Sequence, residues 1–96
     1  MARMAAKSAT VVVEHETGLH ARPASMFVQT ASKFETDISV RKAGGETEVD
    51  AKSSIAVLSL GVGPDEEIVI TADGNDGEQA VERLVELVRN DFDLDS

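Results

Sequence analysis

The sequence contains no cysteine, no tryptophan and no tyrosine. Without cysteine, neither a disulfide framework nor a thiolate metal site can hold the fold together. Three phenylalanines offer little of the aromatic surface on which nucleic-acid bases stack. No apolar run has the length of a membrane-spanning helix, and residues 1–8 lack the hydrophobic stretch of a signal peptide. We therefore expect a cytoplasmic protein that binds neither nucleic acid nor membrane and that uses no metal or cofactor.

Basic residues are also scarce. The chain has 18 acidic and 9 basic residues, only four of them lysine, and its formal net charge is −9. Proteins that bind phosphate backbones carry basic stripes, which strengthens the exclusion of nucleic acid. The acidity has two interpretations: ordinary solubility, or adaptation to high salt, where screening relieves the repulsion between carboxylates. The sequence leaves both open.

With 96 residues, the chain has room for one domain with one small core. We expect a flexible extension at residues 1–8, a single domain at residues 9–92 and an acidic tail at residues 93–96. The domain is expected to be a monomer.

The stretch at residues 17–24 (TGLHARPA) places a histidine at the start of an expected helix. After His20, apolar residues recur at the spacing of one buried helix face, and polar residues fall on the other side. The apolar set is Ala24, Phe27, Val28 and Ala31, and the polar set is Ser25, Gln29 and Ser32. Pro23 suits a first helical turn, where its missing N–H has no intrahelical partner. The helix is expected to begin within residues 21–23, just after His20.

This position suits anion binding beside the imidazole. The free N–H groups of a first helical turn and the helix dipole attract a dianion, and Arg22 adds a fork of donors. A neutral imidazole is a nucleophile near neutral pH, and a phosphoryl group on His20 would lie among these donors. Spacing alone leaves open that His20 is a capping or surface residue. His15, between two glutamates, is expected to be a solvated strand-end residue.

Strands are expected before and after this helix. Residues 10–14 include three consecutive valines and predict an inner strand, because the run is apolar on both faces. Alternating residues at 36–42 and 46–50, separated by Gly44 and Gly45, predict a hairpin.

The second half of the chain predicts a short helix, a strand and a long helix. Residues 52–60 form the short helix, with Ser53 as its N-cap, and residues 66–72 alternate as a strand. The long helix is expected to be capped near Asn75 or Asp76. Its expected buried face consists of Ala80, Val81, Leu84, Leu87 and Val88.

The element order is therefore βαββαβα, with each strand apolar mainly on one side. This order predicts an α+β fold, a four-stranded antiparallel sheet with three helices on one face. Element order alone would equally permit a ferredoxin-like module.

Residues 18–24 (GLHARPA) strongly resemble the active-site signature of the HPr family, the histidine-containing phosphocarrier proteins of the phosphoenolpyruvate-dependent sugar phosphotransferase system. The likeness continues in the family's order through residues 28–34 (VQTASKF), 51–61 (AKSSIAVLSLG) and 80–87 (AVERLVEL). The resemblance covers nearly everything from about residue 10 to residue 92, and it implies an open-faced β-sandwich.

The resemblance also implies a mechanism. Enzyme I, phosphorylated from phosphoenolpyruvate, would pass its phosphoryl group to Nδ1 of His20, and His20 would donate it to the IIA domain of an enzyme II complex. Arg22 would neutralise the group, and the backbone amides of Ala21 and Arg22 would receive its oxygens. The chain would be a phosphocarrier with a phosphohistidine intermediate and not an autonomous enzyme.

Ser53 matches the regulatory serine that an HPr kinase phosphorylates in some members of the family. A helix cap explains the same serine without any kinase, and the neighbouring Ser54 leaves the site assignment open. A phosphate at this position would act by like-charge repulsion at the docking face.

The resemblance implies a docking patch formed by Ser25, Gln29, Ile55 and Leu58 beside Arg22. Ser54 departs from the family here, because a bulky apolar residue is more typical at its position. Ordinary core packing is the alternative role for Ile55 and Leu58.

Other functions remain compatible with the sequence. Within the family, the carrier could serve nitrogen regulation or dihydroxyacetone phosphorylation. A small phosphatase would also use an anion-binding loop with histidine and arginine, but it would turn over a phosphoester. A non-catalytic βαββαβ ligand-binding module would not need His20.

Overall fold

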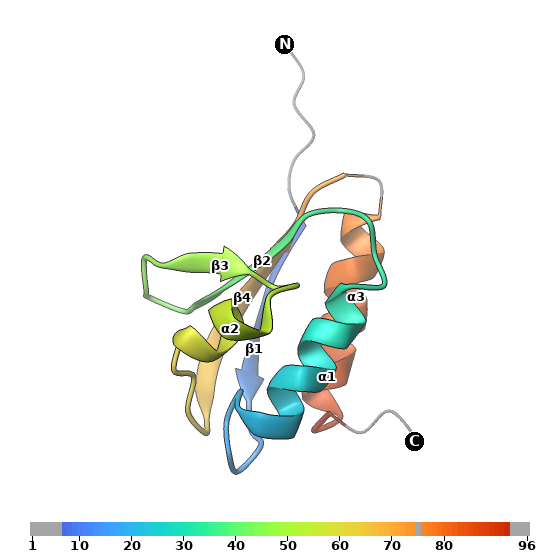
Figure 1. Ribbon diagram of the computed structural model, residues 1–96. Coiled ribbons are helices and arrows are strands. Elements are labelled where there is room, and N and C mark those ends of the chain that lie inside the picture. The colour runs from blue at the N-terminus through green and yellow to red at the C-terminus, as the bar shows by residue number, and fades with distance from the viewer. Residues whose placement is uncertain (1–6, 75, 93–96) are drawn as a thin grey trace.

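The computed structural model describes residues 7–74 and 76–92, and the order of its elements is βαββαβα, as predicted. The elements are β1 (Lys7–Val13), α1 (Ala21–Ala31), β2 (Ile38–Lys42), β3 (Glu48–Asp50), α2 (Ser54–Ser59), β4 (Glu66–Ala72) and α3 (Gly77–Arg89). The strands form one sheet in the order β1-β4-β2-β3, and every neighbouring pair is antiparallel. The helices cover one face of this sheet, and the other face is open (Figure 1). The predicted α+β open-faced sandwich is confirmed.

The prediction that the first strand lies inside the sheet is wrong. β1 is an edge strand that pairs only with β4. Val11 and Val13 are buried beneath the helices, whereas Val12, on the opposite face, is half-buried. The valine run reflects the preference of β-branched side chains for strands, and this preference does not require burial on both faces.

The ends of several elements also differ from the prediction. β1 includes Lys7 and Ser8, which were assigned to the extension, because both pair with the end of β4. β3 has three residues, since only these pair with β2 after the turn at Gly44 and Gly45. The expected tail and the rest of the extension lie outside the described residues, as does Asn75. Asp76 is the N-cap of α3, although its side chain makes no capping hydrogen bond.

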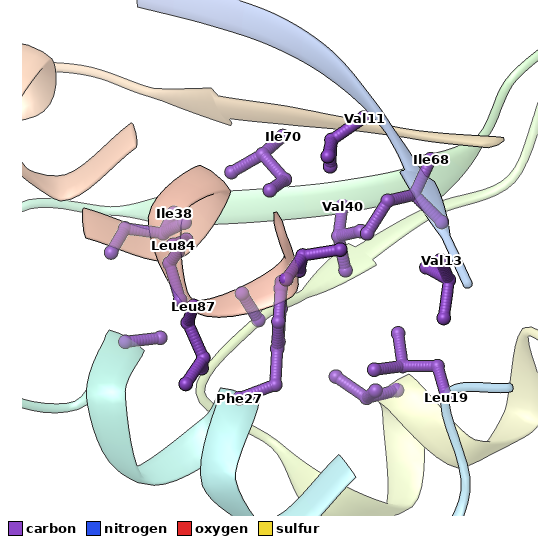
Figure 2. Packing of buried hydrophobic residues seen from close by; sticks show 14 of the residues in the cluster. Val11, Val13, Leu19, Phe27, Ile38, Val40, Ile68, Ile70, Leu84 and Leu87 are labelled. Carbon is purple, nitrogen blue, oxygen red and sulfur yellow. The ribbon is translucent and has the colours of Figure 1, made fainter. Parts of the chain in front are cut away.

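The core lies between the sheet and the helices. All five residues predicted for the buried face of α3 are buried. Phe27 points from α1 toward the strands and is fully buried (Figure 2). Leu19, the residue before His20, belongs to the same cluster and is also fully buried. The loop that carries His20 is therefore anchored in the core by its own neighbour.

Candidate functional site

His20 is the N-cap residue of α1. Its backbone is extended, with φ −133° and ψ 167°, and its side chain makes no capping hydrogen bond. The residue is half-buried. The helix begins at Ala21, as the position of Pro23 predicted. The imidazole is therefore placed at the mouth of the helix without being used to close it.

The first turn of α1 has two backbone N–H groups without a partner inside the helix, and both lie next to His20. The N–H of Ala24 is directed to the carbonyl oxygen of His20 at 3.5 Å, and Pro23 has no N–H. The N–H groups of Ala21 and Arg22 precede the first intrahelical hydrogen bond. No acidic residue lies in this turn, and the side chain of Arg22 is exposed. The turn therefore combines two backbone donors, a guanidinium and the positive end of a helix dipole.

Ala21 has a left-handed backbone, with φ +52°. This conformation costs a non-glycine residue about 1–2 kcal/mol, so the surrounding structure must hold it in place. Its neighbours in the chain are the N-cap His20 and Arg22, and the buried Pro23 follows Arg22. No feature of the sequence signals this conformation, because alanine is not a residue that favours it.

The loop before His20 rests on the turn after α2. The N–H of Leu19 donates to the carbonyl oxygen of Val62 at 3.0 Å. Gly18 has φ +70°, and a Cβ atom on it would lie 2.3 Å from that carbonyl oxygen and 2.7 Å from atoms of Gly63. Only glycine fits here, both for its backbone angle and for the close approach.

Glu66 supports this turn. One of its carboxylate oxygens, Oε1, accepts a hydrogen bond from the N–H of Gly63 at 2.7 Å and lies 3.4 Å from Nζ of Lys42. The hydrogen bond from Gly63, with a smaller effect of Lys42, lowers the pKa of Glu66 despite its desolvation. The ionised carboxylate thus stabilises the fold above the pKa of an unfolded glutamate, and this contribution disappears as the pH falls through the lowered value. No pattern in the sequence distinguishes Glu66 from the other carboxylates of the chain.

His15 is less solvated than its position predicted. Its Nδ1 accepts a hydrogen bond from the N–H of Thr17 at 3.2 Å and lies 2.9 Å from the Thr17 hydroxyl. Its ring is half-buried against the ring of Phe92 in an edge-on contact, with centroids 5.9 Å apart. This packing arises because the chain turns back after α3 and buries Phe92. His15 thus helps to shape the loop between β1 and His20.

Ser53 is the N-cap of α2, as predicted. Its hydroxyl accepts a hydrogen bond from the N–H of Ala56 at 3.3 Å. A cap of this kind contributes about 1 kcal/mol. The next residue, Ser54, is exposed.

The predicted docking residues lie on the outer sides of two helices that contact each other, α1 and α2. Ile55 is 80% exposed and Leu58 is 43% exposed, so neither belongs to the core. On α1, the exposed amide of Gln29 donates to the hydroxyl of Ser25 at 3.1 Å. An isoleucine this exposed has no packing role in the domain itself.

The described residues also limit other kinds of site. Within residues 7–74 and 76–92, no three side chains of histidine, aspartate or glutamate come together in the manner of a metal site. None of the helices in these ranges has the length and the apolar character that crossing a bilayer requires.

Comparison with known proteins identifies relatives along nearly the whole chain. The family model described as "PTS HPr component phosphorylation site" matches residues 7–90. The phosphocarrier protein HPr of Haloferax volcanii is 47% identical over 79 residues, which cover 82% of this chain and 89% of that protein. Among solved structures, HPr-C-His from Thermoanaerobacter tengcongensis has a TM-score of 0.84 and 44% identity, covering 90% of this chain and 94% of that one. A phosphocarrier protein HPr from Bacillus anthracis has a TM-score of 0.81 and 42% identity, covering 88% and 98%.

Proposed function

Because this chain belongs to the HPr family of phosphocarrier proteins, we propose that His20 accepts a phosphoryl group from enzyme I and donates it to an enzyme IIA domain, for sugar uptake and phosphorylation. Proteins of this family act with components of the phosphotransferase system and are not themselves enzymes. The observation that carries the proposal is the place of His20 at the mouth of α1, with its side chain not engaged in capping.

In the proposed transfer, a lone pair on the imidazole, on Nδ1 as the resemblance implies, attacks phosphorus while the bond from phosphorus to the donor breaks. The backbone N–H groups of Ala21 and Arg22 receive the phosphoryl oxygens, and the Arg22 guanidinium offsets their charge. The two backbone N–H groups are fixed by the helix before the phosphoryl group arrives, so they need little reorganisation. The reverse displacement by the next acceptor restores the free imidazole.

The docking patch for both partners is proposed to be Ser25, Gln29, Ile55 and Leu58. Exposed apolar side chains on one small surface mark interaction sites. A patch of this size suits a transient complex, which a carrier needs because it must leave one partner before it meets the next.

Ser53 is proposed as a regulatory site for an HPr kinase. A phosphate at the start of α2 would be tolerated by the helix dipole, while its charge would repel acidic groups of a docking partner. Mass spectrometry after incubation with such a kinase tests this assignment. Phosphate found on Ser54, or on neither serine, would contradict it.

We propose that the carrier works in the cytoplasm and as a monomer. Service in nitrogen regulation or dihydroxyacetone phosphorylation uses the same histidine chemistry with other partners, so it is compatible with the same site. Labelled, phosphorylated protein can be offered to acceptor proteins of the sugar, nitrogen-regulation and dihydroxyacetone pathways. The acceptor that takes up the label identifies the pathway that the carrier serves.

The test is phosphorylation from labelled phosphoenolpyruvate in the presence of enzyme I. The wild type should take up one label that is acid-labile and alkali-stable, and it should pass this label to a IIA domain. His20→Ala should take up none, because it lacks the imidazole that would form the bond to phosphorus. His15→Ala is the matched control and should be labelled. Label retained by His20→Ala, or continuous release of inorganic phosphate by the isolated protein, would contradict the proposal.

A further inference from the structure

A chain of hydrogen bonds runs from the sheet to the residue before His20. The peptide unit that joins Val62 and Gly63 takes part at both ends. Its N–H donates to Oε1 of Glu66 at 2.7 Å, and its carbonyl oxygen accepts from the N–H of Leu19 at 3.0 Å. Hydrogen bonds in such a chain polarise one another, so a carboxylate on the N–H side makes the carbonyl oxygen of the same peptide a stronger acceptor.

The carboxylate that begins this chain is itself held in place. Glu66 lies on the same face of β4 as Ile68 and Ile70, which is the face that the helices cover. The carboxylate lies at the partly exposed end of that face, where Nζ of Lys42 on β2 is 3.4 Å from its Oε1. Both side chains are partly exposed, at 38% and 42%, and an ion pair of this kind contributes little to stability. The ion pair matters more for geometry than for stability, because Lys42 helps to fix the direction of the Glu66 carboxylate.

The turn that carries Glu66 has little freedom to move. The N–H of Asp65 donates to the carbonyl oxygen of Val13, at the end of β1, at 2.7 Å. Gly18 is packed so closely on the Val62 carbonyl that no Cβ atom would fit between them. A shift of the Val62–Gly63 peptide would therefore be transmitted to Gly18 and Leu19, and from there to His20.

From these contacts we infer that Glu66 is a positioning residue for His20, acting through the Val62–Gly63 peptide and the backbone of Leu19. The inference rests on the proposed function, because it concerns how the imidazole is held for phosphoryl transfer. Glu66 touches neither the histidine nor the path of the phosphoryl group. It keeps the loop in the one arrangement that places His20 at the mouth of α1.

The first test needs no partner protein and no phosphate. The amide protons of Gly63 and Leu19 are followed by NMR in the wild type, Glu66→Gln and Glu66→Ala. Glu66→Ala should shift the Leu19 amide proton upfield and speed its exchange with solvent by about tenfold, as expected for a weakened local hydrogen bond. Glu66→Gln keeps an acceptor oxygen without the charge and should give an intermediate result, which a purely structural loss would not produce.

Glu67→Gln is the matched control, because it removes the same charge from the neighbouring, exposed position of β4. It should leave the Leu19 amide unchanged. A Leu19 amide that responds to neither substitution at Glu66, or that responds equally to Glu67→Gln, would overturn the inference. Glu66→Gln keeps the test informative if Glu66→Ala does not fold.

The second test measures phosphoryl transfer from enzyme I. Glu66→Ala should lower the maximal rate about three- to tenfold, as small misplacements of a reacting group do, and leave KM unchanged because the docking patch is intact. Transfer at the wild-type rate would refute the positioning role while leaving the proposed function in place. If the wild type accepted no phosphoryl group, the proposed function would fail, and the NMR result alone would decide the role of Glu66.

Discussion

At the scale of single residues, the site depends on backbone geometry that only certain side chains allow. Ala21 has a left-handed conformation that strains the chain where the phosphoryl group is expected to bind. Gly18 has a left-handed conformation without strain, but it is confined by the Val62 carbonyl oxygen. At Ala21 the fold imposes a strained backbone on an ordinary residue. At position 18 the close approach of the Val62 carbonyl oxygen requires a glycine.

Gly18→Ala should therefore be among the most damaging single-methyl additions to this protein. The added Cβ would meet backbone atoms at 2.3 Å and 2.7 Å, which cannot move aside as a side chain would. We expect the free energy of unfolding to fall by about 3 kcal/mol or more, the sum of the left-handed penalty and of overpacking. Urea titration of the variant measures this loss.

Gly44→Ala is the matched control for that experiment. Gly44 has φ +82°, but a methyl group added to it would meet no atom within 4 Å, so this position carries the backbone penalty without the clash. Its loss should be about 1 kcal/mol. Equal losses at the two positions would show that the close approach of the loop to Val62 has no energetic consequence.

At the scale of elements, α1 and α2 have different proposed roles. The first turn of α1 offers the backbone donors proposed to bind the phosphoryl group, and α2 presents apolar side chains to solvent. α2 has only six residues, and Val57 is the residue of it that is buried. The helix is therefore held by Val57 and by its Ser53 cap, which leaves Ile55 and Leu58 available for contact.

Ile55→Ser should weaken docking without unfolding the protein. The isoleucine is 80% exposed, so the free energy of unfolding should change by less than about 0.5 kcal/mol. The KM for transfer from enzyme I should rise about five- to tenfold, because a side chain at the centre of a small interface contributes on the order of 1 kcal/mol.

Steady-state phosphorylation kinetics check this prediction. Gln79→Ala, an exposed position on α3 outside the patch, serves as the control and should keep the wild-type KM. An unchanged KM in Ile55→Ser would remove α2 from the docking surface.

At the scale of the whole molecule, the dominant feature is unbalanced charge. The net charge is −9, and the salt bridges found among residues 7–74 and 76–92 are Lys42–Glu66 and Arg83–Glu86. Most carboxylates in that part of the chain are thus unpaired and repel one another. The similarity to a protein of the halophile Haloferax fits the interpretation of this acidity as adaptation to salt.

Salt should therefore stabilise the domain. Raising sodium chloride from about 0.1 M to about 1 M shortens the Debye length from about 10 Å to about 3 Å and screens the repulsion. We expect Tm to rise by at least about 5 °C, which corresponds to roughly 1 kcal/mol for a domain of this size. Chloride is the right anion, because sulfate also strengthens apolar burial. A flat melting series would leave ordinary solubility as the explanation of the acidity.

Local features of the sequence determined the elements and the place of His20. Pro23 and the apolar spacing after it predicted where α1 begins, because a missing N–H and a 3.6-residue period act within a few residues. The cap at Ser53 was predictable for the same reason. The exposure of Ile55 came from the resemblance, since spacing alone left core packing open.

Contacts between distant segments were decided only by the tertiary structure. The edge position of β1, the approach of Val62 to Gly18 and the packing of His15 on Phe92 each join residues far apart in the chain. In the sequence, Glu66 is one more polar residue at the start of a strand, and only the fold brings Lys42 to its carboxylate and Leu19 to the Val62 carbonyl oxygen. Periodicity and turn chemistry describe neighbours in sequence, whereas the support of His20 comes from neighbours in space.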